Sequence, residues 1–434
     1  MIGASTHGRF AINVASSLDQ NAGGASRFSI LWILDFDYSV GLRHGATMRY
    51  VHLARELTTL GNTVHFAVTN HPWVHREERN HYLDKLHTEG HLAGYHVFAP
   101  YECSRWRRWV GKLALYPGVA NALLRRARQS LTAGLVNLMA EQGLNAVLVS
   151  DRYYLPMLSQ LSAAAPTLVD WGDSMTLTLL RGVRVRPARV LSALKDLVDI
   201  APQELFWPRH ADANMAVSPV DAAFLGRMNR RPDKAFVVYN GIDAWTTPEY
   251  GDSREPGRLI FTGNMSFPPN YDAAIWFIDR VLPRLRAARS DIRFVVAGQN
   301  PVEELMRRVS PHVEVLGYCP DLQAEIARSQ LFVAPMVSGS GFKNKVLEAL
   351  ETGTYVACTR IGAEFLPERL KEKLLVSGSA KEMAGQILSY LDKPSEFAPR
   401  LREAHEIVRD QFAWNKSAQA IVNILGKVSA RRAP

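Results

Sequence analysis

The sequence GSGFKNKVLEALE, residues 339–351, is the stretch that decides the expected fold. It follows an apolar run, LFVAPMV at residues 331–337, which is typical of a buried strand. The Gly-Ser-Gly loop then gives way to a helical pattern that places Val346, Leu347 and Leu350 on one face. A glycine loop that enters a helix presents backbone N–H groups and partial positive charge, and both favour an anion.

The charged side chains of this stretch indicate which kind of anion would bind. Lys343 and Lys345 lie at the start of the helix, and Glu348 follows Lys345 by three residues, on the same side. Amides and ammonium groups suit a diphosphate, and a carboxylate suits the vicinal hydroxyls of a ribose. The stretch fits a nucleotide-sugar site. It also fits an ordinary helix start that carries a surface Lys345–Glu348 pair.

The composition is that of an ordinary globular protein. The 434 residues are 47% hydrophobic and 21% charged, and this length suits two or three domains. The three cysteines are scattered and fit a reducing cytoplasm better than a disulfide framework or a metal site. A net charge of +9 indicates anionic partners, such as nucleic acid, an anionic membrane surface or phosphorylated ligands. We expect a cytoplasmic protein that can bind peripherally to the inner face of the membrane.

Strand-like runs alternate with helical patterns along most of the chain, which predicts an α/β protein with two doubly wound domains facing each other across a cleft. We place one domain at residues 28–240 and the other at 258–411, with a polar hinge rich in glycine and proline at 241–257. Residues 1–27 are expected to be a disordered lead-in, and residues 412–434 a terminal helix.

The stretch at residues 101–130 is strongly basic. It holds seven basic residues and one acidic residue, with tryptophan, leucine and tyrosine between them. Such a stretch can lie on an anionic membrane surface or bind nucleic acid. It can equally be a solvated helix whose arginine stems cover apolar surface. Nucleic acid is disfavoured, because no recognition module surrounds the stretch.

Two features of the first domain are candidates for chemistry. Gly45 precedes a helix and can let backbone approach an anion, or can simply form a turn. Asp173 lies in TLVDWGDS at residues 167–174, a strand-like run that leads into a loop, near the carboxyl edge where open sheets place their sites. It is a candidate base or orienting group for an acceptor, or a helix cap. We expect no metal, on the ground that we recognise no Asp-x-Asp pair of the metal-binding kind beside a strand end.

Six motifs occur in one order along the chain: the Gly45 loop with Arg49, VVYNGID (237–243), FTGNM (261–265), VVAGQNP (295–301), VEVLGYCPDL (313–322) and GSGFKNKVLEAL (339–350). In this order they resemble the retaining GT-B glycosyltransferases of family 4, often called glycosyl transferases group 1. The resemblance covers nearly everything from residue 28 to residue 425. The segment DWGDS (170–174) is similar to members associated with bacterial exopolysaccharide assembly.

The resemblance implies a metal-independent transfer, with retention, from a UDP- or GDP-sugar to a saccharide or lipid-linked acceptor. The C-terminal domain would bind the donor and the N-terminal domain the acceptor, and the terminal helix would pack back across the domain interface. Glu348 would hold the ribose. Lys343 and Lys345 would face the diphosphate, with Lys343, Glu348 and Asp173 as the catalytic set. The donor-binding positions would be Gly45, Gly263, Asn264, Gly317, Tyr318, Gly339, Ser340, Gly341, Phe342 and Lys345.

Three departures from the family pattern stand out. Ser340 occupies the position of the first motif glutamate, and Asn264 and Asn270 stand where many members carry arginine and lysine. Residues 150–152, Ser-Asp-Arg, replace an acceptor-side histidine. These changes leave two other readings open. One is a catalytically degenerate protein that binds a nucleotide sugar or a lipid head group. The other is a GT-B-fold sugar epimerase, for which we find no suitable acidic and histidine residues.

Overall fold

The computed structural model describes most of the chain, and its contacts divide it into two units. Unit 1 comprises Met1–Thr176, Leu194–Tyr239 and Asn415–Pro434, and unit 2 comprises Leu177–Ala193 and Asn240–Trp414. Contacts thus group residues 177–193 with unit 2, although they lie within the predicted N-terminal segment 28–240. The described residues are 13–14, 27–36, 45–70, 74–99, 117–242 and 254–432, with the backbone alone described at 13–14, 45 and 117–128.

Unit 1 is built on an eight-stranded sheet in the order β1-β8-β7-β6-β5-β2-β3-β4, in which all the paired strands are parallel. Ile30, Leu31 and Trp32 of β2 are fully buried, as expected for a strand covered on both faces. The strands are β1 (Asn13–Val14), β2 (Ser29–Leu34), β3 (Thr63–Thr69), β4 (Gly94–Phe98), β5 (Ala146–Val149), β6 (Thr167–Asp170), β7 (Ala213–Ala216) and β8 (Ala235–Val237).

Helices lie in each connection from β2 to β8, as is usual for the crossovers between parallel strands. Helices α6 and α7 cross the boundary between the units, and α18 begins at its edge and ends in unit 1. The helices are α1 (Gly45–Thr59), α2 (Arg76–Thr88), α4 (Pro117–Glu141), α5 (Leu158–Ala164), α6 (Met175–Val185), α7 (Val190–Phe206), α8 (Pro219–Met228) and α18 (Trp414–Arg432).

Two predicted segments fall largely outside the described residues. Within the expected lead-in at 1–27, Asn13–Val14 forms β1 and pairs with β8. Within the basic stretch at 101–130, residues 117–130 form the start of α4, and residues 101–116 lie outside the described part. Residues 243–253 of the predicted hinge also lie outside it.

Unit 2 carries a six-stranded parallel sheet in the order β11-β10-β9-β12-β13-β14. The chain moves outward from β9 to β11 and then returns to place β12 on the other side of β9. This reversal creates a switch point between β9 and β12, where open sheets bind ligands beyond the carboxyl ends of the strands. The strands are β9 (Glu255–Thr262), β10 (Arg293–Ala297), β11 (Val313–Gly317), β12 (Ser329–Ala334), β13 (Val356–Thr359) and β14 (Leu375–Ser377).

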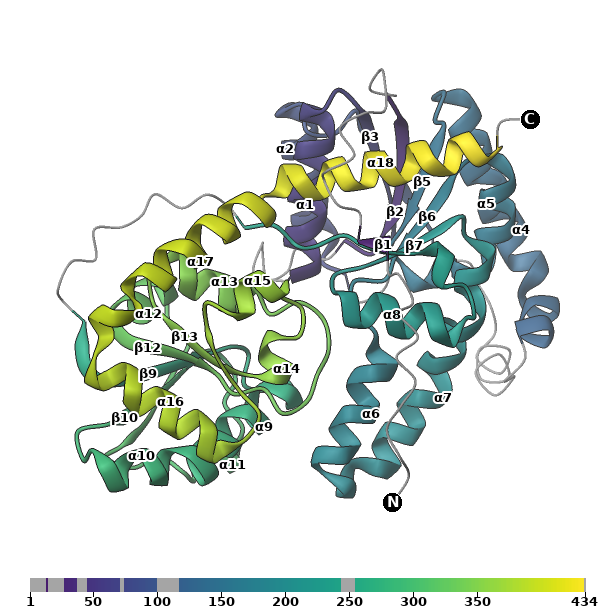
Figure 1. Ribbon diagram of the computed structural model, residues 1–434. Helices are drawn as coiled ribbons and strands as arrows, with labels where there is room; N and C mark the ends of the chain where they lie inside the picture. Colours follow the sequence, from purple (N-terminus) through teal and green to yellow (C-terminus); the bar gives the residue numbers. More distant parts are fainter. Residues whose placement is uncertain are drawn as a thin grey trace. The chain divides into compact units, whose positions relative to one another are not determined.

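Helices cover this second sheet, and α10 and α16 lie side by side in Figure 1. A single π-helical turn, Phe277–Val281, joins α9 to α10. The helices are α9 (Pro268–Trp276), α10 (Leu282–Ala288), α11 (Glu303–Met306), α12 (Leu322–Ala327), α13 (Asn344–Glu351), α14 (Arg360–Ala363), α15 (Glu368–Lys371), α16 (Ala380–Asp392) and α17 (Ala398–Gln411).

A buried ion pair ties together three elements of unit 1. Arg49 of α1 donates to both carboxylate oxygens of Asp170, at 2.8 and 3.3 Å, and to the backbone carbonyl of Tyr239 at 3.1 Å. Both charged side chains are almost fully shielded from solvent. The pair therefore joins α1 to the end of β6 and to the segment that follows β8.

We expect Arg49→Ala to destabilise the protein by about 3–5 kcal/mol, because Asp170 is left as a buried, uncompensated charge. The free energy of unfolding from urea titration measures this effect. Arg231→Ala, which breaks an exposed pair with Asp233, is the control and should cost about 1 kcal/mol or less. Equal losses in the two variants would contradict the structural role of the Arg49–Asp170 pair.

Candidate functional site

The loops after β9 and β10 approach each other so closely that both need glycine. A Cβ atom on Gly298 would lie 1.8 Å from the carbonyl oxygen of Gly263. A Cβ atom on Gly263 would lie 2.8 Å from both the Asn270 amide nitrogen and the Lys345 ammonium. The positive φ angles of Gly263 and Gly298, 153° and 143°, disfavour any other residue as well. The missing side chains bring backbone directly over Lys345.

Lys345 reaches from the first turn of α13 to the loop that follows β9. Its ammonium donates to the Asn270 side-chain oxygen at 2.7 Å and lies 4.5 Å from the centre of the Phe261 ring. The Asn270 amide in turn donates to the Asn264 carbonyl at 2.9 Å. Burial lowers the pKa of Lys345 to about 7, although Glu348 opposes this shift. Lys345 is thus a poorly solvated cation held by a neutral amide and a ring face.

The start of α13 has the features of an anion site. Its N-cap residue, Lys343, makes no side-chain hydrogen bond to cap the helix. Ser338, in the loop before the helix, has a buried hydroxyl with no hydrogen-bond partner among the described residues. Glu348 lies one turn into the helix, and burial raises the pKa of its carboxyl group while Lys345 lowers it. These groups fit the phosphate and hydroxyl chemistry inferred from the sequence.

Lys343 points into an ion-pair cluster. Its ammonium lies 3.1 Å from Glu364 and donates to the Gly341 carbonyl at 3.0 Å. Arg181 of α6 donates to both oxygens of Glu364, at 2.7 and 2.9 Å, and to the Gly339 carbonyl at 2.7 Å. We call Arg181, Glu364 and Lys343 the loop-bracing cluster, because each member other than Glu364 also holds a carbonyl of the glycine loop.

The other predicted donor residues of the glycine loop have structural contacts of their own. The Ser340 hydroxyl lies 2.7 Å from that of Thr178. Phe342 packs its ring against Phe365 and Phe412, with centroid distances of 4.5 and 5.6 Å. The φ angles of Gly339 and Gly341 are +93° and +74°, so both turns of the loop favour glycine.

The remaining predicted donor residues lie on other segments. Gly317 ends β11 with φ of +69°, and the Tyr318 side chain that follows is 52% exposed. Gly45 begins α1 in unit 1. The Gly298 amide donates to the Gly317 carbonyl at 2.7 Å, which connects the end of β11 to the close approach of Gly263 and Gly298 beside Lys345. The roles proposed for Gly45, Gly317 and Tyr318 stay predictions.

Asp173 lies in unit 1, just beyond the carboxyl end of β6. Burial, together with the nearby Asp221 carboxylate, raises the pKa of Asp173 to about 6. The helix α6 that follows is capped by other groups. The Met175 amide donates to Glu204 at 2.9 Å, and the Ser174 amide donates to Asp221 at 3.0 Å. Asp173 therefore keeps a carboxyl group that can titrate near neutral pH.

Several residues of these sites escaped the sequence analysis. Arg181, Glu364, Glu204 and Asp221 meet their partners through contacts between distant segments, which no local pattern signals. An Asp-x-Asp pair also stands at residues 35 and 37, directly after β2, although no such pair was expected beside a strand end. Only Asp35 of that pair is described. Among the described residues no group of three or more acidic, histidine or cysteine side chains could hold a metal ion.

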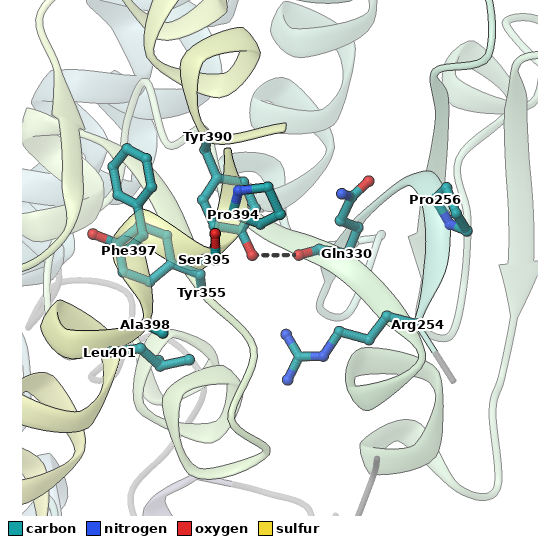
Figure 2. A pocket seen from close by; sticks show the side chains of 10 residues that line it. All are labelled: Arg254, Pro256, Gln330, Tyr355, Tyr390, Pro394, Ser395, Phe397, Ala398 and Leu401. Atoms are coloured by element: carbon teal, nitrogen blue, oxygen red, sulfur yellow. Dashed lines mark hydrogen bonds between the residues drawn. The ribbon is translucent and has the colours of Figure 1, made fainter. Parts of the chain in front are cut away.

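A pocket of about 500 Å³ lies at the opposite edge of the unit 2 sheet (Figure 2). Its residues include Arg254, Gln330 and Tyr355, which precede or begin β9, β12 and β13. The Tyr355 and Tyr390 rings stack at 5.1 Å, and the Tyr390 hydroxyl donates to the Gln330 carbonyl at 3.1 Å. Because this pocket faces the amino ends of the strands, it is separate from the Lys345 network.

Among the described helices, none has the length and apolarity needed to span a membrane.

Part of the chain matches a known protein family. Residues 256–393 match the model of the family glycosyl transferases group 1. A 173-residue segment is 29% identical to an uncharacterized 44.6 kDa protein in the cps region of Klebsiella pneumoniae, and covers 38% of this chain and 45% of that protein. A 249-residue segment is 24% identical to phosphatidyl-myo-inositol mannosyltransferase of Mycolicibacterium smegmatis, and covers 55% of this chain and 64% of that protein. The chain thus spans roughly half to two thirds of these relatives.

Solved structures show the same fold over nearly the whole chain. HepE of Anabaena, solved in complex with UDP-glucose, is 16% identical with a TM-score of 0.59, over 93% of this chain and 100% of that one. TarM of S. aureus is 9% identical with a TM-score of 0.60, over 92% of this chain and 99% of that one. The predicted fold, two doubly wound Rossmann-like domains of the GT-B class, is confirmed.

The low pKa of Lys345 predicts that nucleotide-sugar binding weakens as the pH rises above about 7. A bound diphosphate would raise this pKa, so binding above pH 7 takes up a proton, and affinity falls by up to about tenfold per pH unit. UDP-glucose is the suitable probe, because its phosphates do not titrate in this range. Isothermal titration calorimetry in buffers of different ionisation enthalpy measures both affinity and proton uptake.

Lys345→Arg is the matched variant, since its guanidinium stays charged throughout. It should bind UDP-glucose without a slope above pH 7. A wild-type affinity that stays flat between about pH 6 and about pH 9 would show that Lys345 does not face the ligand.

Proposed function

We propose that this chain is a glycosyltransferase that moves a sugar from a nucleoside diphosphate sugar to a saccharide or lipid-linked acceptor. The observation that supports it most is the Lys345 network, which sits at the β9/β12 switch point inside the segment that matches group 1 glycosyl transferases. We further propose retention of anomeric configuration, independence of metal ions, and a cytoplasmic role in polysaccharide or glycoconjugate synthesis. UDP and GDP are the candidate nucleotides.

The donor would bind along the carboxyl edge of unit 2. The amides at the start of α13 and the Lys345 ammonium would face the diphosphate, and Glu348 would accept hydrogen bonds from the ribose. Gly263 and Asn264 would lie beneath the phosphates, because the absent side chain at Gly263 lets backbone approach Lys345. Gly317 and Tyr318 would read the base.

The chemistry asks the protein to stabilise a departing diphosphate. Breaking the bond between the sugar and the phosphate leaves positive charge on the sugar and negative charge on the leaving group. A cation that is already poorly solvated, such as Lys345, interacts more strongly with that charge than one in water. Lys343 would add to this field, and its cluster with Glu364 and Arg181 would hold the glycine loop in place before the donor arrives.

Asp173 would act on the acceptor, as a base or as an orienting group. Its pKa of about 6 leaves it mostly ionised at neutral pH yet able to take a proton. The relatives that modify phosphatidylinositol by name, and the one from a cps region, support a lipid-linked or saccharide acceptor.

A non-catalytic binding protein is the second candidate. Ser340 stands where the family pattern has a glutamate, and its hydroxyl pairs with Thr178. A panel of UDP-, GDP- and ADP-sugars, followed by tests of the best donor on lipid-linked acceptors, separates the two. Transfer or slow hydrolysis supports the enzyme, and tight binding without turnover supports the binding protein. The anomeric configuration of the product tests retention, and activity in EDTA tests metal independence.

Lys343→Ala and Glu348→Ala are each expected to abolish transfer and leave the fold intact. The first removes a positive charge from the phosphate-binding loop, while Glu364 stays paired with Arg181. The second removes the ribose acceptor. Initial rates with the best donor, together with thermal unfolding, provide the measurement. Lys371→Ala, on α15 of the same unit, is the control. Wild-type turnover by both purified variants would refute the site.

Asp173→Asn is expected to lower kcat/KM by about 10²–10⁴-fold if Asp173 is the base. In the wild type, kcat/KM should fall as the pH drops through about 6, where Asp173 becomes protonated. The variant should lose this acid limb. An orienting role would instead lower the rate and keep the limb, and an unchanged rate would remove Asp173 from the mechanism. Asp233→Asn, an exposed acid of the same unit, is the control.

A further inference from the structure

Exposed hydrophobic side chains concentrate in one short part of the molecule. Ten large hydrophobic side chains are exposed among the described residues, and five of them lie between residues 180 and 198. On α7, Leu191 is 78% exposed, Leu194 51% and Val198 45%. Single exposed leucines are ordinary, but several on one helix indicate a surface that binds something.

These α7 residues lead into an apolar groove in unit 1. The groove has a volume of about 500 Å³, and every side chain that lines it is apolar. Seven of its residues lie on α7 at spacings of three and four, which places them along one stripe of the helix. We define the α7 surface as Leu191 together with the groove residues Leu194, Leu197, Val198, Ala201, Pro202, Leu205, Phe206 and Met228.

Exposed cations border the α7 surface. Arg209 places its guanidinium 5.3 Å from the centre of the Phe206 ring at one end of the groove. Arg227 and Arg230 are exposed on either side of Met228 in sequence, and Lys195 follows Leu194. The helix also carries acids. Helical spacing places Asp196 on the face opposite the stripe, and Asp199 beside the stripe, one turn after Lys195. Positive charge therefore predominates at the rim of the apolar surface, with Asp199 as an acid on the same side.

We propose that the α7 surface docks the protein onto a bilayer that contains anionic lipid. The groove offers only aliphatic and aromatic side chains, which an acyl chain can fill without hydrogen bonds. Specific protein partners instead favour tyrosine, tryptophan and arginine anchors. The bordering arginines and Lys195 would meet lipid phosphates, and the net charge of +9 adds to this attraction. The α7 surface is distinct from the basic stretch at 101–130, and its docking does not depend on sugar transfer.

Vesicle sedimentation with the full chain tests the proposal. Wild-type protein should bind phosphatidylcholine vesicles that contain phosphatidylglycerol, and should bind pure phosphatidylcholine much more weakly. Leu191→Glu/Leu194→Glu should lower the binding at least about tenfold, because two buried contacts with lipid become charged. Lys195→Gln/Arg209→Gln should lower binding to the anionic vesicles about fivefold per charge removed and make it less sensitive to salt.

Met306→Glu/Val309→Glu is the matched control. These side chains are similarly exposed, at 44% and 49%, but belong to the end of α11 and the turn after it, not to the α7 surface. The control should bind vesicles as wild type does, and UDP-glucose affinity with thermal unfolding should verify that every variant is folded. Because the α7 surface shares no residue with the nucleotide-sugar site, failure of docking and failure of transfer are separable.

Three results would overturn the proposal. One is a wild-type protein that does not bind anionic vesicles. Another is binding that survives the α7 substitutions but is lost in Trp106→Ala/Trp109→Ala, which would assign the membrane contact to residues 101–130. The third is a concentration-dependent dimer in light scattering that the α7 substitutions dissociate, which would make the surface an interface between two copies.

Discussion

Unit 2 depends on one close approach, in which the backbone around Gly263 lies against both Gly298 and the Lys345 ammonium. A side chain at either glycine would push the two loops apart and separate the β9 loop from α13. The approach exists because β9 and β12 are neighbours with opposite connections, so the loops after them open toward a common space. The anion-binding chemistry that we propose for the sequence GSGFKNKVLEALE therefore depends on the sheet order as well as on its own residues.

The two lysines of that sequence have different surroundings, although they are only two positions apart. Lys343 forms an ion pair with the Glu364 carboxylate and donates a hydrogen bond to the backbone of the glycine loop. Lys345 bonds to a neutral amide and a ring face, and its charge is therefore compensated less. In the proposed site, Lys343 would maintain the shape of the loop. The charge of Lys345 would instead be stabilised by the bound diphosphate. A similar division of roles occurs in unit 1. Glu204 and Asp221 accept hydrogen bonds from the backbone at the start of α6, whereas the Asp173 carboxyl group can titrate near pH 6.

The parts of this structure that are local in sequence were predictable, and the long-range contacts were not. Apolar runs such as residues 331–337 predicted strands correctly, because buried parallel strands need hydrophobic residues on both faces. Glycines marked the loops because few other residues adopt their φ angles. The contact of Arg181 with Glu364 joins segments 183 positions apart, and no periodicity encodes it. Strand β1, with two residues, is too short for any pattern to indicate. The roles assigned to individual site residues rest on family resemblance and remain proposals.

The way the chain is divided between its units has a consequence for how the protein is made. The last segment of unit 1, residues 415–434, follows the whole of unit 2 in sequence, and α18 contributes Ala418, Ile421 and Leu425 as fully buried side chains. Synthesis on the ribosome releases the amino-terminal part first. Even so, the earlier-made unit cannot complete its hydrophobic core until the later-made one has already emerged. Part of the apolar surface of unit 1 therefore stays uncovered until unit 2 has been synthesised, and exposed apolar surface of this kind favours aggregation of a nascent chain.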